Sequence, residues 1–278
     1  MVNLDKNFSP LGAENAIQFQ SFVFAGGEPH IKISSNFDPS VAVQLTHRIN
    51  SFNDLGLICT TVDALKRMGV KTIKLFIPYF PAARQDRVMV AGEPLTVKVY
   101  ADIVNALGLD NVTVFDPHSE VTPALLNNCT VITNHAFIRK VVAQIGEGVK
   151  LISPDGGALK KIYKVSEFLG GAEVVECSKS RDVKTGRLSG FKVYADDLEG
   201  VDCLIIDDIC DGGGTFIGLA KELKNKNAGK LYLAISHGIF SKGFNELAEY
   251  FDQIFTTDSI KEIEEVGVTQ IKLQDILQ

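Results

Sequence analysis

One stretch of the sequence, VDCLIIDDICDGGGTFIGLAKEL, restricts the possible folds of this chain more than any other. It spans residues 201–223, and its apolar run from Cys203 to Ile206 is followed by two adjacent acids. Three glycines then precede apolar residues at helical spacing. This order predicts a buried strand that ends at the acids, a glycine-rich turn and a helix. In α/β folds, ligands bind at such a turn, beyond the carboxyl end of the strand.

The residue types at this turn indicate a ligand that carries both phosphate and hydroxyl groups. Glycines let the backbone approach a ligand closely, and the free N–H groups at the start of a helix attract phosphate. Carboxylates suit sugar hydroxyls, whose hydrogen bonds they accept, or a divalent cation. The candidate ligand-binding residues at the turn are Asp207, Asp208, Asp211, Gly212, Gly213, Gly214 and Thr215.

Two well-known phosphate loops do not match this turn. The GxxxxGK[ST] loop needs a lysine directly after its glycines, and none is present here. The GxGxxG fingerprint has two residues before its last glycine, whereas three separate Gly214 from Gly218. What remains is a DDxxDGGGT turn before a helix or, as the structural alternative, a glycine-rich turn that binds nothing.

Apolar runs alternate with helical patterns along the whole chain, which predicts an α/β fold with mainly parallel sheets. The polar segment from Cys177 to Gly190 is rich in turn residues and predicts a flexible hairpin. The length of 278 residues fits two domains of medium size. The expected strands are 22–24, 31–33, 41–45, 71–77, 112–115, 149–153, 172–175, 203–206, 231–236 and 253–256. The expected helices are 51–66, 97–107, 137–145, 160–168, 216–223 and 246–250.

Composition excludes several classes of function. A formal net charge of −6 argues against a general nucleic-acid binder. No apolar run approaches the roughly 18 residues of a membrane span, and the first residues lack a signal peptide pattern. The five cysteines are odd in number and form no CxxC pair, which favours a reducing, cytoplasmic setting. We therefore expect no nucleic-acid and no membrane partner.

Polar side chains follow several of the expected strands. In open α/β sheets these carboxyl ends are where sites form. Each group alone is a weak signal, because a single histidine after a strand is more often structural, and cations in a loop or hairpin are often only solvated. These residues are Arg84, Gln85, His118, Asp155, Lys179 and Arg181.

Taken together, the segments resemble the phosphoribosyl pyrophosphate synthetase family over residues 22–270. FIPYFPAARQDR, at 76–87, is similar to the family's IPYxxYARQDR, and GEPLTVKVYADIV, at 92–104, to its EPITAKLVA. DPHSE, at 116–120, is similar to DLHxxQ. SPDGG, DDICDGGGT, SHGIFS and TTD correspond in the same order. The resemblance implies an α/β fold of two phosphoribosyltransferase-like domains with mainly parallel sheets flanked by helices.

The resemblance also implies the division of the chain and its reaction. Residues 1–140, with 265–278 returning to them, would form an ATP-binding domain, and 141–264 a ribose- and phosphate-binding domain. The anomeric hydroxyl of a ribose 5-phosphoryl acceptor would attack the β-phosphorus of ATP and release AMP. Such an ATP-dependent pyrophosphokinase needs in-line positioning and neutralisation of phosphate charge, part of which Mg²⁺ would supply.

Residue roles follow from the matched motifs. Lys179 and Arg181 match a cationic flexible loop that would act on the reacting phosphates. His118 and Asp155 would lie beside the metal, and Asp155 and the DDxxDGGGT turn would bind the acceptor. The matched ATP-binding residues are Phe24, Glu28, Arg84, Gln85 and His118. Because the family's FSDGE loop reaches a neighbouring subunit's ATP, a homodimer or higher homo-oligomer is expected.

The sequence also departs from the family pattern. FSDGE stands here as FAGGE at 24–28, so the loop's aspartate is missing. The N-terminal segment before that loop is short and is expected to lack the family's first strand and helix. Gly212 occupies a place where the family has a hydroxyl residue beside the acceptor's 5′-phosphate.

The departure at Gly212 bears on the acceptor. A missing side chain widens the pocket and removes a donor, which favours a bulky 5′ substituent over a phosphate dianion. The turn also looks like that of phage-type ADP-ribose pyrophosphate synthetases, whose product serves NAD resynthesis. We therefore expect ADP-ribose ahead of ribose 5-phosphate, which would give phosphoribosyl pyrophosphate. Neutral drift at Gly212, a non-catalytic regulatory homologue and a true phosphoribosyltransferase are the alternatives.

Overall fold

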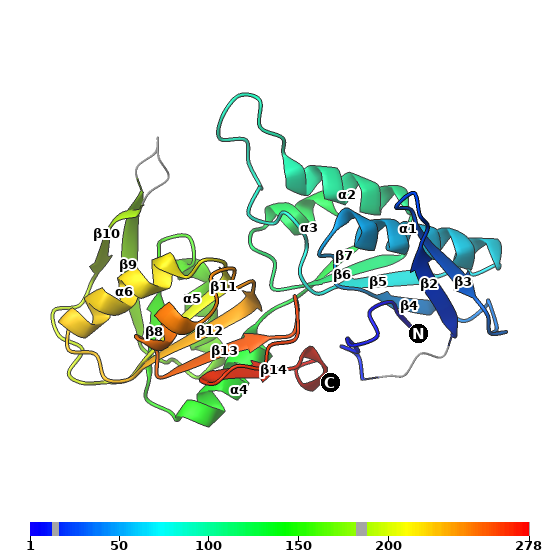
Figure 1. The fold of residues 1–278 in the computed structure, drawn as a ribbon. Coiled ribbons are helices and arrows are strands. Elements are labelled where there is room, and N and C mark those ends of the chain that lie inside the picture. The colour runs from blue at the N-terminus through cyan, green and yellow to red at the C-terminus, as the bar shows by residue number, and fades with distance from the viewer. Residues whose placement is uncertain (13–16, 182–187, 278) are drawn as a thin grey trace. The chain divides into compact units, whose positions relative to one another are not determined.

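The computed structural model describes residues 1–12, 17–181 and 188–277, apart from the side chains of 180, 181, 188 and 189. The chain forms two compact units (Figure 1). The first comprises Met1–Thr133 and the C-terminal segment from Leu273, and the second comprises Asn134–Lys272.

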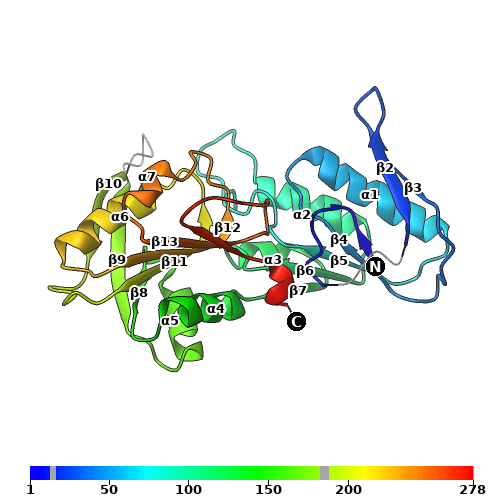
Figure 2. The ribbon, with the colours of Figure 1, turned by 60° about the horizontal axis from the view of Figure 1, so that its bottom comes forward.

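The first unit is built on a parallel five-stranded sheet with strand order β1-β4-β5-β6-β7. Helices α1 and α2 cover one face of this sheet (Figures 1 and 2). An antiparallel hairpin of β2 and β3 packs against α1 through β3. The strands are β1 Val2–Asn3, β2 Phe19–Val23, β3 Pro29–Ile33, β4 Val43–Thr46, β5 Ile73–Ile77, β6 Asn111–Phe115 and β7 Cys129–Ile132. The helices are α1 Phe52–Arg67, α2 Thr96–Ala106 and α3 Val121–Leu125.

Helix α1 begins as the sequence predicts. Ser51 is its N-cap, and the Ser51 hydroxyl accepts a hydrogen bond from the backbone N–H of Asp54 at 3.2 Å. The apolar positions of its inner face are buried, including Leu55 and Ile58. The Asp54 carboxylate also lies 3.6 Å from Nε2 of the buried His47, so the cap is joined to the end of β4.

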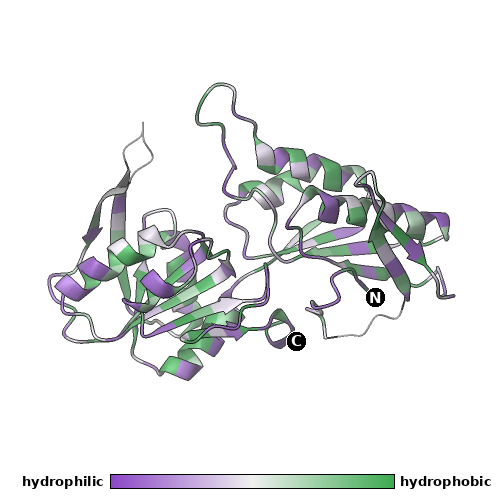
Figure 3. Cartoon of the chain, viewed as in Figure 1, coloured by the Kyte–Doolittle hydropathy of each residue, from purple (hydrophilic) through white to green (hydrophobic). Residues whose placement is uncertain are grey.

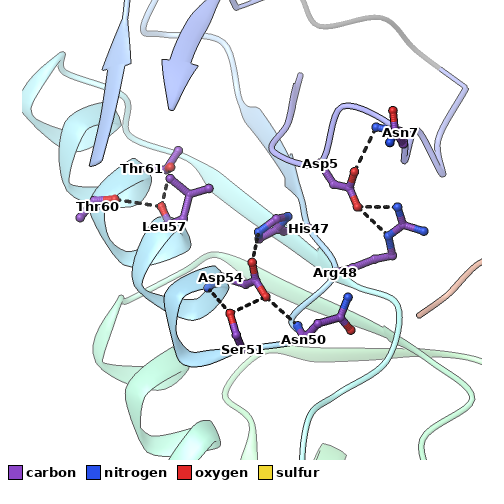
Figure 4. A network of polar contacts seen from close by, with 10 residues as sticks. All are labelled: Asp5, Asn7, His47, Arg48, Asn50, Ser51, Asp54, Leu57, Thr60 and Thr61. Atoms are coloured by element: carbon purple, nitrogen blue, oxygen red, sulfur yellow. Dashed lines mark hydrogen bonds and ion pairs between the residues drawn. The ribbon is translucent and has the colours of Figure 1, made fainter. Parts of the chain in front are cut away.

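A polar network ties the N-terminal segment to β4 (Figure 4). Arg48 donates to Asp5 from Nε at 2.7 Å, and its guanidinium lies over the ring of Phe8. Asn3 of β1 pairs in parallel with Thr46, whose hydroxyl donates to the Asn3 side chain at 2.6 Å. The expectation that this segment lacks a first strand is therefore wrong, because β1 completes the edge of the sheet.

The second unit contains a seven-stranded sheet with strand order β10-β9-β8-β11-β12-β13-β14. All neighbouring strands are parallel except β9 and β10, which form the expected hairpin around residues 182–187, outside the described part. The strands are β8 Lys150–Ser153, β9 Val174–Arg181, β10 Leu188–Val193, β11 Cys203–Cys210, β12 Leu231–Gly238, β13 Gln253–Thr257 and β14 Val268–Ile271.

Helices cover both faces of this second sheet. Helices α4 and α5 lie on one face and α6 and α7 on the other (Figures 1 and 2). The hydrophobic colouring of the strands and the mixed colouring of the helices fit this layering (Figure 3). The helices are α4 His135–Ile145, α5 Leu159–Phe168, α6 Gly214–Asn225 and α7 Asn245–Ala248. The 3₁₀ turn η1, Leu273–Asp275, belongs to the first unit.

The unit boundaries differ from those expected at 140/141 and 264/265. Helix α4 contacts α5 and β12, so it belongs to the second unit as a whole. Strand β14 pairs with β13, which keeps the chain in the second unit as far as Lys272.

Strand β11 lies in the middle of the second sheet, and it is longer than predicted. It pairs with β8 as far as Ile205, but with β12 as far as Cys210. The prediction that the strand ends at the acids is wrong, because pairing with β12 keeps the backbone extended through them. Asp207 and Asp208 therefore lie within β11, beyond the last pairing of β8.

Candidate active site

The glycine turn of the second unit leads from β11 into α6. Gly213 has φ +76°, a conformation that requires glycine, and a Cβ added there would also lie 3.1 Å from the Leu247 side chain, a tight contact. Gly212 is different: its φ is not left-handed, and an added Cβ would meet only the stem of Lys242 at 3.5 Å. The fold therefore requires glycine at 213 but not at 212.

The two acids of β11 interact with each other. The backbone N–H of Asp208 donates to Oδ1 of Asp207 at 2.9 Å, and Asp208 is buried. Burial and, next, the charge of Asp208 raise the pKa of Asp207 well above its usual value. This pair therefore favours a shared proton, a cation or a ligand that donates hydrogen bonds.

Asp155 and Lys179 are brought together at the carboxyl end of β8. The Asp155 carboxylate accepts from the backbone N–H groups of Gly157 at 2.8 Å and Ala158 at 3.0 Å, and forms an ion pair with Lys179 of β9. Although burial alone would raise it, the pKa of Asp155 is lowered, chiefly by the hydrogen bond and charge of Lys179. In this arrangement two predicted site residues neutralise each other.

A second loop, residues 239–243 after β12, is fastened to the glycine turn. Ser241 donates from its hydroxyl to Oδ1 of Asp211 at 2.6 Å, and from its N–H to the Asp211 carbonyl. The N–H groups of Ile239 and Phe240 both donate to the Cys210 carbonyl. The structure thus places Lys242 against the turn, a neighbour that the sequence analysis missed and for which no local sequence signal exists.

In the first unit, the loops after β5 and β6 meet at Asp86. Although burial would raise it, the pKa of Asp86 is lowered by hydrogen bonds from Arg87 and Ser119 and by the charges of Arg87 and His118. Sequence analysis did not select Asp86, because its buried position is visible only in the fold. The expected residues around it are Arg84, Gln85 and His118, all of which are exposed.

Both of these loops contain unusual backbone. Ala82 has φ +57° and Asp116 has φ +40°, values that residues other than glycine rarely adopt. Each lies within a few residues of an expected ATP-binding group. Such conformations cluster at binding sites, where the surrounding structure maintains them.

Phe24 and Glu28 lie in the turn between β2 and β3. Phe24 is exposed and packs edge-on against Phe22, with ring centroids 4.9 Å apart. The Glu28 carboxylate folds back over Gly26, where an added Cβ would lie 2.6 Å from its Oε2. An aspartate at position 26 would therefore require the Glu28 carboxylate to take another position.

Comparison with known proteins identifies the family. A family model described as the N-terminal domain of ribose phosphate pyrophosphokinase matches residues 13–108. The ribose-phosphate pyrophosphokinase of Vibrio cholerae is 31% identical over 264 residues, which are 91% of this chain and 83% of that protein. The chain belongs to the ribose-phosphate pyrophosphokinase family.

Further comparisons agree with this assignment. The ribose-phosphate pyrophosphokinase of Pyrococcus abyssi is 31% identical over 255 residues, covering 88% of this chain and 85% of that protein. The crystal structure of phosphoribosylpyrophosphate synthetase from Mycobacterium smegmatis superposes with a TM-score of 0.80 at 23% identity, covering 94% and 88% of the two chains. The expected fold class, with two phosphoribosyltransferase-like domains of mainly parallel sheets, is confirmed. Ribose-phosphate pyrophosphokinases are diphosphotransferases, so this chain is an enzyme of that class.

The predicted site residues fall into two groups, one in each unit. The first unit holds Phe24, Glu28, Arg84, Gln85 and His118. The second unit brings the acids and glycines of the turn, Thr215, Asp155 and Lys179 to the ends of neighbouring parallel strands. The Arg181 side chain lies outside the described part of the structure.

Two negative findings concern the described residues only. They contain no group of three or more His, Cys, Asp or Glu side chains arranged to hold a metal ion. They also contain no helix with the length and apolar character needed to cross a bilayer.

The ion pair of Asp155 and Lys179 gives a prediction. In a Lys179→Met variant the pKa of Asp155 should rise, because its largest stabilising partner is lost and only the backbone N–H groups remain. Carboxyl ¹³C chemical shifts followed through a pH titration measure this pKa directly. Lys150→Met, which breaks the separate pair with Glu173, is the matched control. An unchanged Asp155 titration in Lys179→Met would show that the pair is absent in solution.

Proposed function

We propose that this enzyme transfers the β,γ-diphosphate of ATP to the anomeric hydroxyl of a ribose 5-phosphoryl acceptor and releases AMP. The observation that carries the proposal is the second unit's constellation of a glycine turn, an acid pair and a lysine at adjacent strand ends. The glycine turn suits the acceptor's phosphoryl group, the acid pair suits its hydroxyls, and the lysine suits the phosphates that are transferred. The relatives named above carry the name of this activity.

The acceptor would be held by complementary groups. Backbone N–H groups of Gly213, Gly214 and Thr215, at the start of α6, would bind its 5′-phosphoryl group. Asp207 and Asp208 would accept hydrogen bonds from the ribose hydroxyls. Since the pKa of Asp207 is raised, these donors would also relieve the repulsion between the two carboxyl groups.

Lys179 would supply charge to the phosphates in the transition state, together with Arg181. Phosphoryl transfer depends on positioning and on neutralising charge that spreads over phosphate oxygens. Lys179 forms an ion pair with Asp155 in the free chain, so it would move from one anion to another when the phosphates bind. Asp155 would therefore hold the Lys179 side chain at the carboxyl end of β8 before the substrates arrive.

ATP would bind to the first unit. Arg84 and His118 are exposed at the carboxyl ends of β5 and β6, and Gln85 lies beside Arg84. The lowered pKa of Asp86 keeps a negative charge beneath these loops, beside the exposed Arg84 and His118.

The acids also fit Mg²⁺, which would lower the charge of the phosphates. Carboxylate oxygens are the donors that this cation prefers, and it is often held by one or two carboxylates together with substrate phosphates. Asp155, Asp207 and Asp208 are such donors, and Asp155 would become available when Lys179 leaves it. His118 is the less suitable of the two expected metal-binding residues, because its donor is nitrogen.

The acceptor that we propose is ADP-ribose, and Gly212 supports it. Neither backbone conformation nor space requires glycine at this position, so its missing side chain has no structural cause. Without a side chain at Gly212 the nearest atoms here belong to the exposed stem of Lys242, which could move aside for a substituent that extends outward from the 5′-phosphoryl group. The product would be ADP-ribose pyrophosphate, as in the phage-type branch of the family, with NAD resynthesis as its use. The five cysteines are free, and three of them are buried, which agrees with a cytoplasmic setting.

Comparing acceptors tests this proposal. AMP release from ATP and Mg²⁺ should be faster with ADP-ribose than with ribose 5-phosphate, measured as kcat/KM. If ribose 5-phosphate is favoured tenfold or more, about 1.4 kcal/mol of transition-state preference, the argument from Gly212 is wrong while the reaction class stands. Absence of AMP with both acceptors would overturn the pyrophosphokinase proposal itself.

We also propose that the hairpin of β2 and β3 completes a nucleotide site in a second copy of the chain. Its exposed rings, Phe22 and Phe24, are suited to stacking on an adenine. Sedimentation at assay concentration should then show a dimer or larger species, and Phe24→Ala should raise KM for ATP. A fully active monomer with an unchanged KM for ATP in Phe24→Ala would contradict the shared site.

A further inference from the structure

The glycine turn is itself strongly acidic. From residue 207 to residue 215 it carries three carboxyl groups and no lysine or arginine. A phosphoryl group bound at the start of α6 would meet backbone N–H groups, but also the negative field of these acids. A compensating cation from elsewhere in the chain is therefore expected beside the turn.

Lys242 occupies this place. Its Cδ and Cε lie 3.5 Å from the position that a Cβ on Gly212 would take, and its Cγ lies 3.8 Å away. Nζ is one single bond of about 1.45 Å beyond Cε, so the ammonium lies within about 5 Å of the same position. The lysine stem thus lies on the surface that the missing side chain of Gly212 leaves uncovered.

The position of Lys242 is built into the fold. The preceding residue, Ser241, is fixed by a hydroxyl bond and a backbone bond to Asp211, so the loop and the turn move together. Phe240, with φ +46°, and Gly243, with φ +74°, give the loop its tight path. Because Phe240 is buried, and both Phe240 and Gly243 are left-handed, the backbone at the exposed Lys242 between them is held in place.

The charge of Lys242 is also uncommitted. Among the described residues, no carboxylate forms an ion pair with it and no hydrogen bond uses its ammonium. Two other lysines of the second unit are engaged: Lys179 pairs with Asp155, and Lys261 donates to the Ile239 carbonyl at 2.7 Å. Lys242 is therefore a cation beside the turn that is available to an anion.

We propose that Lys242 binds the 5′-phosphoryl group of the acceptor and determines affinity for it, which rests on the proposed function above. Gly212 and Lys242 act as a pair in this role. The lysine stem lies beside the turn at Gly212, and the lysine supplies the charge that the turn lacks. The same chemistry serves the single phosphate of ribose 5-phosphate and the diphosphate of ADP-ribose.

Calorimetric titration of the full chain with each acceptor, without ATP, tests the proposal. Lys242→Met should weaken binding of the preferred acceptor about tenfold or more, and Lys242→Arg should retain most of the affinity. Lys230→Met is the matched control, because Lys230 is exposed on the same sheet but precedes β12, at the opposite end of the strand. It should bind as the wild type does. Thermal unfolding of each variant checks that the fold is retained.

The outcomes are distinguishable. If the wild type binds an acceptor and Lys242→Met binds it equally well, the role of Lys242 is refuted while the proposed function stands. If the wild type binds neither acceptor, the proposed function fails and the role of Lys242 falls with it. If Lys242→Met loses more affinity for ADP-ribose than for ribose 5-phosphate, the lysine contacts both phosphates of the diphosphate. An equal loss of affinity shows that it contacts one.

Discussion

The parallel pairing of β11 with β8 on one side and β12 on the other is the constraint on which the second unit depends. Parallel strands run in the same direction, so their carboxyl ends meet at one edge of the sheet. Cys203 pairs with Lys150 and with Leu231, which fixes the register of all three strands. Side chains from three distant parts of the sequence are therefore brought to one edge by backbone hydrogen bonds.

The unequal lengths of these strands create the chemistry at that edge. Because β8 ends at Ser153 while β11 continues, Asp207 and Asp208 have a paired neighbouring strand, β12, on one side and none on the side of β8. Burial and the charge of Asp208 raise the pKa of Asp207. The free-energy cost of placing two carboxyl groups together is smaller where a ligand donates hydrogen bonds to them. Asp155 and Lys179 form a second poised pair at the neighbouring strand ends. In the free enzyme the side chains of Asp155, Lys179, Asp207 and Asp208 thus contact one another in pairs, and bound substrates would replace these contacts.

Much of this arrangement was predictable from local sequence patterns, and the failures have physical causes. Helix α1 was predicted from its Ser51 cap and apolar spacing, and the middle of β11 from its apolar run. The end of β11 was mispredicted, because acids inside a strand are visible only through its pairing with β12. Strands β7 and β14 were missed, since half-exposed edge strands carry no apolar run.

Contacts between residues far apart in sequence were beyond prediction. Asp211 and Ser241 are 30 residues apart, and nothing in either segment indicates that they bond. The family resemblance identified the glycine turn, but its matched segment SHGIFS ends at Ser241, so Lys242 was not selected. The ion pair of Asp155 and Lys179 was likewise unexpected, although both residues were selected for other roles.

The central claim is that a diphosphate, and not a single phosphoryl group, leaves ATP. ATP labelled with ³²P at the β-phosphorus tests it most directly, with the nucleotide and sugar products separated after reaction with either acceptor. The account predicts that the label appears in the sugar product and that the nucleotide released is unlabelled AMP. Label retained in ADP, with an unlabelled sugar product, would contradict it.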